Sequence, residues 1–129
     1  MAADSASASE SRPPVWAGHV GPHPVTELER SIDFFVALGG RLAVHQPPIA
    51  SIELRGGTHI VLQLADEVDE ESASFDLMVE DIEATHAALV EAGLRPSEIG
   101  PSGAHLRFFV TDPDGTPVRF NSSHVVGIV

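Results

Sequence analysis

The chain has 129 residues, no cysteine and a formal net charge of −12. This charge would repel nucleic-acid backbones and anionic membrane surfaces, so the sequence argues against both as partners. Without cysteine, disulfides and thiolate metal sites are excluded, and a metal ion would need histidine, carboxylate or amide ligands. No apolar run is long enough for a membrane span, and we expect a cytoplasmic protein.

The first half of the chain predicts a strand, a helix and three further strands. Residues 1–14 are rich in Ala and Ser and end in two prolines, which is typical of a disordered tail. Alternating residues predict a strand that begins at Val15. Thr26 and Glu29 form a capping-box pattern, which predicts that a helix begins there. A pair of glycines ends this helix, and three short alternating runs complete a β-α-β-β-β module over residues 15–65.

The second half repeats this order after an acidic linker over residues 66–73. A shift of 54 positions superposes the two halves without a gap. The matched positions are Val25 with Val79, Glu27 with Asp81, Leu28 with Ile82, Glu29 with Glu83, Val36 with Val90, Gly39 with Gly93, and Arg41 with Arg95. Such a density of matches indicates an internal repeat.

The remaining strands complete a second module over residues 74–124. The first of them is expected within residues 94–100, and the last two are joined by the Asp-Pro-Asp-Gly turn at 112–115. Residues 125–129 form a short apolar tail. The predicted fold is therefore α+β, with two tandem βαβββ modules forming a curved mixed sheet around a concave cup.

Each strand of such a module has one face under its helix, and we assign the more apolar face to that side. The assigned core residues are Trp16, Val20, Ile60, Leu62, Leu64, Phe75, Leu77, Val79, Phe108, Val110, Val118 and Phe120. The opposite faces carry His19, Glu53, His59, Gln63, Ser74, Asp76, His105, Arg107, Arg119 and Asn121. A sheet that merely faced solvent would more often carry Lys, Glu and Thr, so this composition indicates a lined site.

A structural role stays open for several of these residues. A single histidine on a strand, such as His59 or His105, is more often a surface or satisfied residue than a ligand. Arg119 could pair with a neighbouring carboxylate as readily as bind or orient a ligand.

Three segments carry a resemblance to a known superfamily. They are HVGPHPVTELERSIDFFVALGG in the first module, FDLMVEDIEATHAALVEAG in the second, and FFVTDPDGTPVRFNSS at the closing hairpin. With the βαβββ repeat, they make residues 15–124 similar to the vicinal oxygen chelate superfamily of glyoxalases, bleomycin-resistance proteins and extradiol dioxygenases. This resemblance implies a fold more than an activity, since the superfamily hosts isomerases, lyases, dioxygenases, metallo-transferases and metal-free drug binders.

The resemblance also implies where a metal ion would bind. Metal-dependent members hold a divalent cation in the cup through four side chains, two from each module. The matching positions are His19, Gln63 where Glu is common, Ser74 where His is expected, and Arg119 where Glu is usual. A guanidinium in the ligand shell would repel the cation and replace a carboxylate that binds it. We therefore expect no usual four-ligand site and no cofactor.

A variant metal site is the alternative. His19, His59 and His105 are assigned to the same kind of face as Gln63 and Asp76. Three imidazoles with a carboxylate would suit iron, nickel or zinc. A bound divalent metal is therefore an open alternative, and so is the function of a metal-dependent lyase, isomerase or dioxygenase.

The leading hypothesis is a metal-free protein that binds a small organic molecule in its cup. The predicted ligand-binding residues combine apolar walls with orienting polar groups, and they are His19, His59, Gln63, Asp76, Met78, His105, Phe109 and Arg119. The net charge favours a cationic ligand, but the positive charges assigned to the cup leave an anionic or neutral polar ligand equally open. Members of the superfamily commonly pair two chains, so the resemblance implies a homodimer. An interaction role through residues 125–129 is a third, weaker hypothesis.

Overall fold

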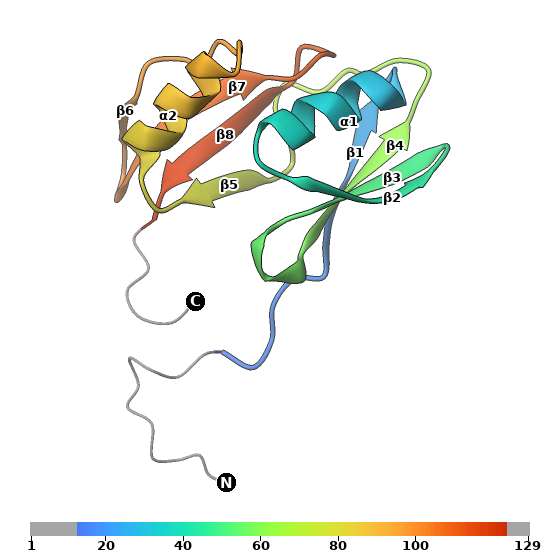
Figure 1. Cartoon of the computed structure of the whole chain (residues 1–129), viewed down its shortest axis with the longest axis horizontal. Coiled ribbons are helices and arrows are strands. Elements are labelled where there is room, and N and C mark those ends of the chain that lie inside the picture. The colour runs from blue at the N-terminus through green and yellow to red at the C-terminus, as the bar shows by residue number, and fades with distance from the viewer. Residues whose placement is uncertain (1–12, 124–129) are drawn as a thin grey trace, which may run out of the picture.

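The computed structural model describes residues 13–123, and Figure 1 shows the course of the chain. Its elements are β1 (His19–Val25), α1 (Leu28–Ala37), β2 (Arg41–Gln46), β3 (Ile49–Glu53), the short helix η1 (Arg55–Gly57), β4 (His59–Leu64), β5 (Asp76–Val79), α2 (Ile82–Glu91), β6 (Gly100–Ser102), β7 (His105–Thr111) and β8 (Pro117–Ser122). The predicted tail over 125–129 lies outside the described residues, as do the first twelve residues of the tail predicted over 1–14.

The strands form two four-stranded sheets, ordered β1-β4-β3-β2 and β5-β8-β7-β6. In each sheet the first strand of the module pairs in parallel with the last, and the other pairs are antiparallel. Each helix packs on its own sheet, α1 on β3 and β4 and α2 on β7 and β8 (Figure 1). The predicted α+β fold with two tandem βαβββ modules is confirmed. None of the described helices is long and apolar enough to span a membrane.

The internal repeat is visible in the boundaries of the elements. The helices span residues 28–37 and 82–91, so the predicted shift of 54 positions relates both of their ends. Gly39 and Gly93 follow the two helices with φ angles of 118° and 91°. These angles lie in the left-handed region that glycine adopts without a steric penalty, which explains why both modules end their helix with glycine.

We expect Gly39→Ala and Gly93→Ala each to lower the free energy of unfolding by about 1–2 kcal/mol, because an added Cβ disfavours positive φ. Gly18→Ala is the matched control, since its added Cβ meets nothing within 4 Å and its φ is not left-handed. That control should stay within about 0.5 kcal/mol of the parent. Urea unfolding measures all three, and equal stability of Gly39→Ala and Gly18→Ala would contradict the expectation.

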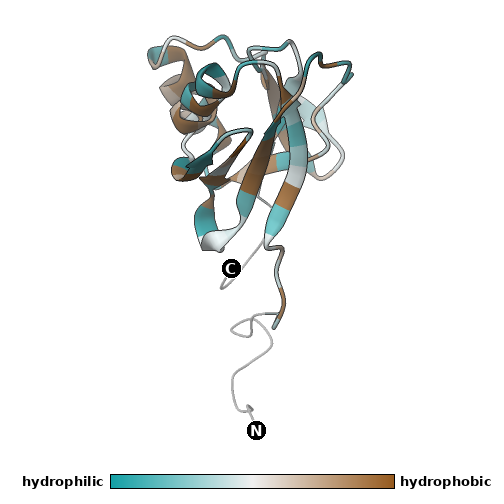
Figure 2. Cartoon of the chain, turned by 90° about the vertical axis from the view of Figure 1, so that its right-hand side faces the viewer, coloured by the Kyte–Doolittle hydropathy of each residue, from teal (hydrophilic) through white to brown (hydrophobic). Residues whose placement is uncertain are grey.

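The hydrophobic core lies between the helices and the sheets of both modules. Its buried residues are Val25, Leu28, Ile32, Phe34, Phe35, Ala50, Ile52, Ile60, Leu62, Ile82, Leu89, Phe108, Val110, Val118 and Phe120. Hydrophobic and hydrophilic residues alternate along the strands that face the viewer in Figure 2. Most residues assigned to the core from this alternation are buried in it or packed against it.

Two core assignments are wrong. Trp16 is 74% exposed, because β1 begins only at His19, opposite the first residue of its neighbour β4, and no strand of the described residues pairs with the segment ahead of that point. Leu64 is 43% exposed at the last position of β4.

The strand expected within residues 94–100 instead forms at β6. Ser97 replaces the strand pairing there, because its backbone N–H donates to the Phe109 carbonyl and its hydroxyl oxygen accepts from the Phe109 N–H, both at 2.8 Å. The Ser97 hydroxyl therefore accepts a hydrogen bond from the Phe109 N–H, which in a regular strand pair would donate to a backbone carbonyl.

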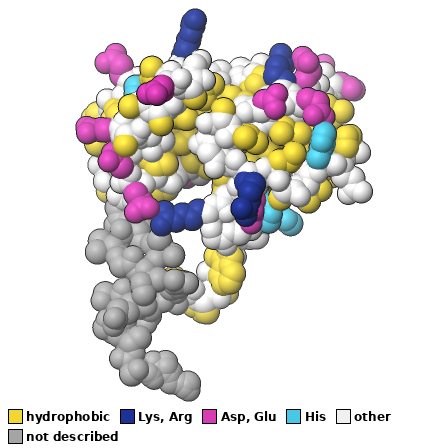
Figure 3. Space-filling model, in the orientation of Figure 1, with side chains coloured by type: hydrophobic (Ala, Val, Ile, Leu, Met, Phe, Trp, Pro, Cys, Tyr) yellow, Lys and Arg dark blue, Asp and Glu magenta, His cyan; other side chains and the backbone are white. Residues whose placement is uncertain are grey.

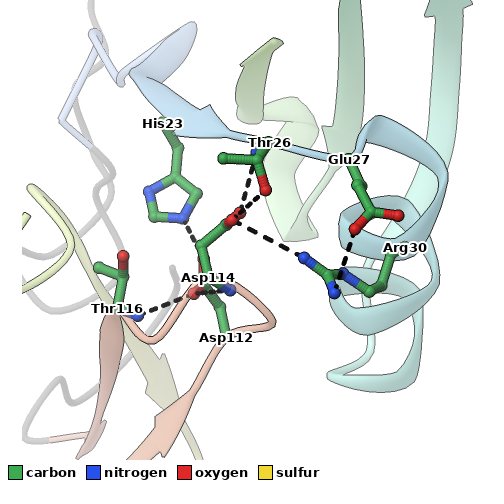
Figure 4. Close-up of polar contacts among 7 residues, drawn as sticks. All are labelled: His23, Thr26, Glu27, Arg30, Asp112, Asp114 and Thr116. Carbon is green, nitrogen blue, oxygen red and sulfur yellow. Dashed lines mark hydrogen bonds and ion pairs between the residues drawn. The ribbon is translucent and has the colours of Figure 1, made fainter. Parts of the chain in front are cut away.

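A buried polar contact joins the two modules (Figure 4). His23 on β1 is 1% exposed, and its Nε2 donates to the Asp112 carboxylate at 2.8 Å. The imidazole also meets the rings of Phe35 and Phe75 edge-on, at centroid distances of 5.4 and 5.5 Å. Asp112 accepts two further bonds, from the backbone N–H groups of residues 114 and 116. The start of one module is thus fixed to the closing hairpin of the other.

The predicted capping box at Thr26 is wrong, because Thr26 takes part in this contact between the modules. The N-cap of α1 is Glu27, which makes no side-chain cap hydrogen bond. Thr26 instead donates its hydroxyl proton to Asp114, and its backbone N–H donates to the same carboxylate at 3.0 Å (Figure 4). Thr26 therefore stabilises the contact between modules rather than the helix end.

Candidate functional site

The strand register sorts the predicted site residues by face. In the second sheet, Phe108 lies opposite Phe120 on the side covered by α2, so the alternate positions point to the other side. We call that side the outer face of the second module, defined by Asp76, Met78, Gly100, Ser102, His105, Arg107, Phe109, Arg119 and Asn121. The outer face of the first module is defined in the same way by His19, Val44, Ile49, Glu53, His59, Val61 and Gln63.

The eight predicted ligand-binding residues divide between these two faces. The first outer face holds His19 and His59, which are register partners with ring centroids 5.7 Å apart, and Gln63 at the exposed end of β4. The second holds the other five, namely Asp76, Met78, His105, Phe109 and Arg119. The structure thus groups three predicted residues on one sheet and five on the other.

A chain of hydrogen bonds fixes Arg119 on the second outer face. Its Nη2 donates to the Ser102 hydroxyl at 2.5 Å, and its Nε donates to the Asn121 side-chain oxygen at 2.7 Å. Asn121 in turn donates from Nδ2 to the Asp76 carboxylate at 3.0 Å. Both direct partners of the guanidinium are neutral, so these bonds orient its charge without neutralising it.

Arg107 lies beside Arg119 on the same face. Its guanidinium carbon is 5.5 Å from the centre of the Phe109 ring, a cation–π geometry. It also lies against Gly100 of β6, where an added Cβ would come within 3.1 Å of the guanidinium. The absence of a side chain at Gly100 therefore leaves the space that Arg107 occupies.

A shallow cavity adjoins this face, with a volume of about 590 Å³. Phe109, Arg119 and Asp76 line it from the sheet, and residues 72–75 line it from the segment ahead of β5. His105 lies further along β7, and its Nδ1 is 2.6 Å from the Ser122 carbonyl. The cavity therefore brings the Phe109 ring, the Arg119 cation and the Asp76 carboxylate to the same place.

The residues at the four metal positions of the superfamily do not suit a divalent cation. His19 offers an imidazole and Gln63 an amide, but Ser74 offers only a hydroxyl and Arg119 a cation that already donates to its neighbours. Within residues 13–123 no three His, Asp or Glu side chains are placed to hold a metal ion together. A hydroxyl and a guanidinium at two of the four positions do not supply the ligands that a divalent cation needs.

Sequence reasoning missed two residues of the face, Ser102 and Gly100. Both belong to β6, which has only three residues and follows an irregular segment. A strand this short is not long enough for an alternating pattern of apolar and polar residues to be recognised. Arg107 and Asn121 were placed on the correct kind of face but outside the predicted ligand set.

Comparison with known proteins gives a family and a fold. A family model described as a glyoxalase-like domain matches residues 23–121. No curated protein sequence matches the chain significantly.

Several solved structures share the fold. A glyoxalase/bleomycin resistance protein/dioxygenase from Alicyclobacillus acidocaldarius is 20% identical, with a TM-score of 0.71 over 88% of this chain and 96% of that one. An antibiotic binding protein from Streptomyces is 21% identical, with a TM-score of 0.66 over 84% and 95%. A lactoylglutathione lyase from Agrobacterium tumefaciens is 13% identical, with a TM-score of 0.71 over 87% and 96%.

Proposed function

Since this chain belongs to the glyoxalase-like family of the vicinal oxygen chelate superfamily, we propose that it binds a small organic molecule on the outer face of its second module. We further propose that binding needs no four-ligand metal site. One observation carries this proposal: Arg119, at the position of a carboxylate ligand, is held in place by Ser102 and Asn121 as an oriented cation. The Streptomyces fold neighbour that binds an antibiotic supports a binding role for such a fold.

The composition of the face suits a small organic ligand. Phe109 and the half-exposed Met78 supply apolar surface, and Arg119 and Asp76 supply polar groups of fixed orientation. Ligand pockets typically combine a mostly apolar wall with a few such convergent polar groups. The adjoining cavity, about 590 Å³, lies within the usual size range for small-molecule sites.

A thermal-shift screen of chelator-treated protein tests this function. We expect small organic ligands to raise the melting temperature of the parent and of Leu106→Ala, whose side chain lies on the same strand but the opposite face. Phe109→Ala should lose most of the shift, because it removes the aromatic ring by which the sheet face lines the cavity. Stabilisation that requires added nickel, zinc, iron or manganese would instead favour the metal-dependent alternative and contradict the proposal.

We also propose that the functional form is a homodimer. The predicted ligand set is divided between two sheets, and large apolar side chains are exposed on both outer faces, Val44 and Ile49 on the first and Met78 on the second. A second copy could place its first outer face against the second outer face of this chain. This arrangement would cover the exposed apolar side chains and bring the two parts of the predicted ligand set together. Light scattering after size exclusion tests this, with twice the chain mass expected and a single-chain mass contradicting it. The cytoplasmic location stays a prediction of the sequence.

A further inference from the structure

Two arginines on the second outer face differ in their partners from most others in the chain. Arg30, Arg41 and Arg55 each form an ion pair with a carboxylate. For Arg107 and Arg119, no carboxylate oxygen among residues 13–123 lies within 4.0 Å of a guanidinium nitrogen. In a chain with a net charge of −12, two cations on one sheet face that have no acidic partner in the described part of the chain are an unexpected feature.

The register places these two cations around one aromatic ring. Phe109 pairs with Arg119 across β7 and β8, and Arg107 is two residues from Phe109 on the same strand and face. Arg107 and Arg119 are therefore diagonal neighbours on this face. Such neighbours lie about 7–8 Å apart at Cα, a distance that long side chains can span. A ligand that contacts Phe109 therefore lies within reach of both guanidinium groups.

The surroundings keep both charges in place. Arg119 is held by two neutral partners, and Arg107 is held between the Phe109 ring and Gly100. Asp76 lies opposite Arg119 in the register, but one of its oxygens accepts from Asn121. Figure 3 shows many of the acidic side chains gathered around the two helices. Salt screens the charge of those side chains beyond roughly 10 Å.

Building on the proposed function, we propose that the ligand is an organic carboxylate whose anionic group meets Arg107 and Arg119 and whose apolar body contacts Phe109. Guanidinium groups bind carboxylates through paired, charge-assisted hydrogen bonds, which a neutral or cationic group cannot make. The apolar surface of Phe109 and Met78 distinguishes such a ligand from an inorganic anion, which would leave that surface uncovered.

NMR titration of the full chain tests the ligand class with four probes: benzoate, benzamide, benzylamine and inorganic phosphate. We expect benzoate to shift the Nε–H signals of Arg107 and Arg119 together with the Met78 methyl signal, and to bind more weakly at high salt. Benzamide and benzylamine should bind at least about tenfold more weakly, because each lacks the charge that both arginines attract. Phosphate should leave Met78 unshifted.

Variants assign the effect to the two arginines. Arg107→Gln should weaken benzoate binding about tenfold, the loss of one charge-assisted contact. Gly100→Val should also weaken it, since the new side chain displaces the Arg107 guanidinium while leaving its charge. Arg95→Gln is the control, an exposed arginine in the segment between α2 and β6, and it should bind benzoate like the parent.

The outcomes separate this inference from the proposed function. Equal binding of benzamide or benzylamine, or unchanged benzoate binding by Arg107→Gln, overturns the carboxylate assignment while the binding function stands. Shifts of both arginines by phosphate but not by benzoate also overturn it. If no organic probe of any charge shifts Met78 or Phe109, the proposed function falls as well.

Discussion

Asp112→Ala should lower the free energy of unfolding by about 3–5 kcal/mol, because it removes a buried carboxylate that accepts three hydrogen bonds, and a hydrogen bond to a charged group is worth about 1.5–3 kcal/mol. Asp112 is buried and accepts from His23 Nε2 at 2.8 Å and from two backbone N–H groups at 2.9 and 2.8 Å. Its removal leaves all three donors without this acceptor, and buried donors without a partner are costly. Because His23 and Asp112 belong to different modules, the lower stability should affect the unfolding of the whole chain rather than of one module.

Asp33→Ala is the control for this variant. Asp33 is exposed on α1, so its removal should change the free energy of unfolding by no more than about 0.5 kcal/mol. Urea unfolding followed by circular dichroism measures both variants. A loss below about 1 kcal/mol for Asp112→Ala, the worth of an ordinary hydrogen bond, would show that the contact between modules is not built as described.

Arg119→Glu should weaken benzoate binding by at least about 100-fold. The change removes one charge-assisted contact, worth about 1.5–3 kcal/mol. It also places a carboxylate beside the carboxylate of the ligand, and at 4 Å this repulsion is about 4 kcal/mol at an effective dielectric of 20. Calorimetric titration measures the affinity directly.

Arg119→Gln separates the two contributions to that loss. It removes the charge but can still donate to Ser102 or accept a bond on the face, so about a tenfold loss is expected. Thermal melts of both variants control for a general loss of structure. Benzoate affinity of Arg119→Glu within threefold of the parent would exclude a role for this guanidinium in binding.

Local sequence patterns predicted the modules well because each module repeats the same local signals. Val25 and Val79 end equivalent strands, and Gly39 and Gly93 both need the left-handed backbone that closes their helices. These signals act within a few residues. They can therefore be recognised in the sequence without any knowledge of how the modules pack.

Contacts between distant segments account for the errors. Thr26 fits a capping box, but its hydroxyl donates to Asp114, 88 residues away, which no local pattern can reveal. Trp16 is apolar enough for a core, yet no strand within residues 13–123 extends far enough to cover it. In both cases tertiary structure overrides a correct local preference.

The candidate site was predictable in part. Alternation placed Arg107, Phe109 and Arg119 on the same kind of face, because period-2 alternation is fixed once a strand is assigned. It did not show that His19 and His59 would lie on a different sheet from these three, since faces are assigned strand by strand. Nor did it show which cations would have no carboxylate partner, because that depends on side-chain positions.

Calorimetric titration of benzoate into chelator-treated protein tests the central claim most directly. The oriented charges of Arg107 and Arg119 predict saturable binding at one site per chain, unchanged when nickel, zinc, iron or manganese is added back. The same titration with benzamide should give no comparable heat. Benzoate binding that appears only after a metal ion is restored, or benzamide binding of equal strength, would contradict a metal-free anion site on this face.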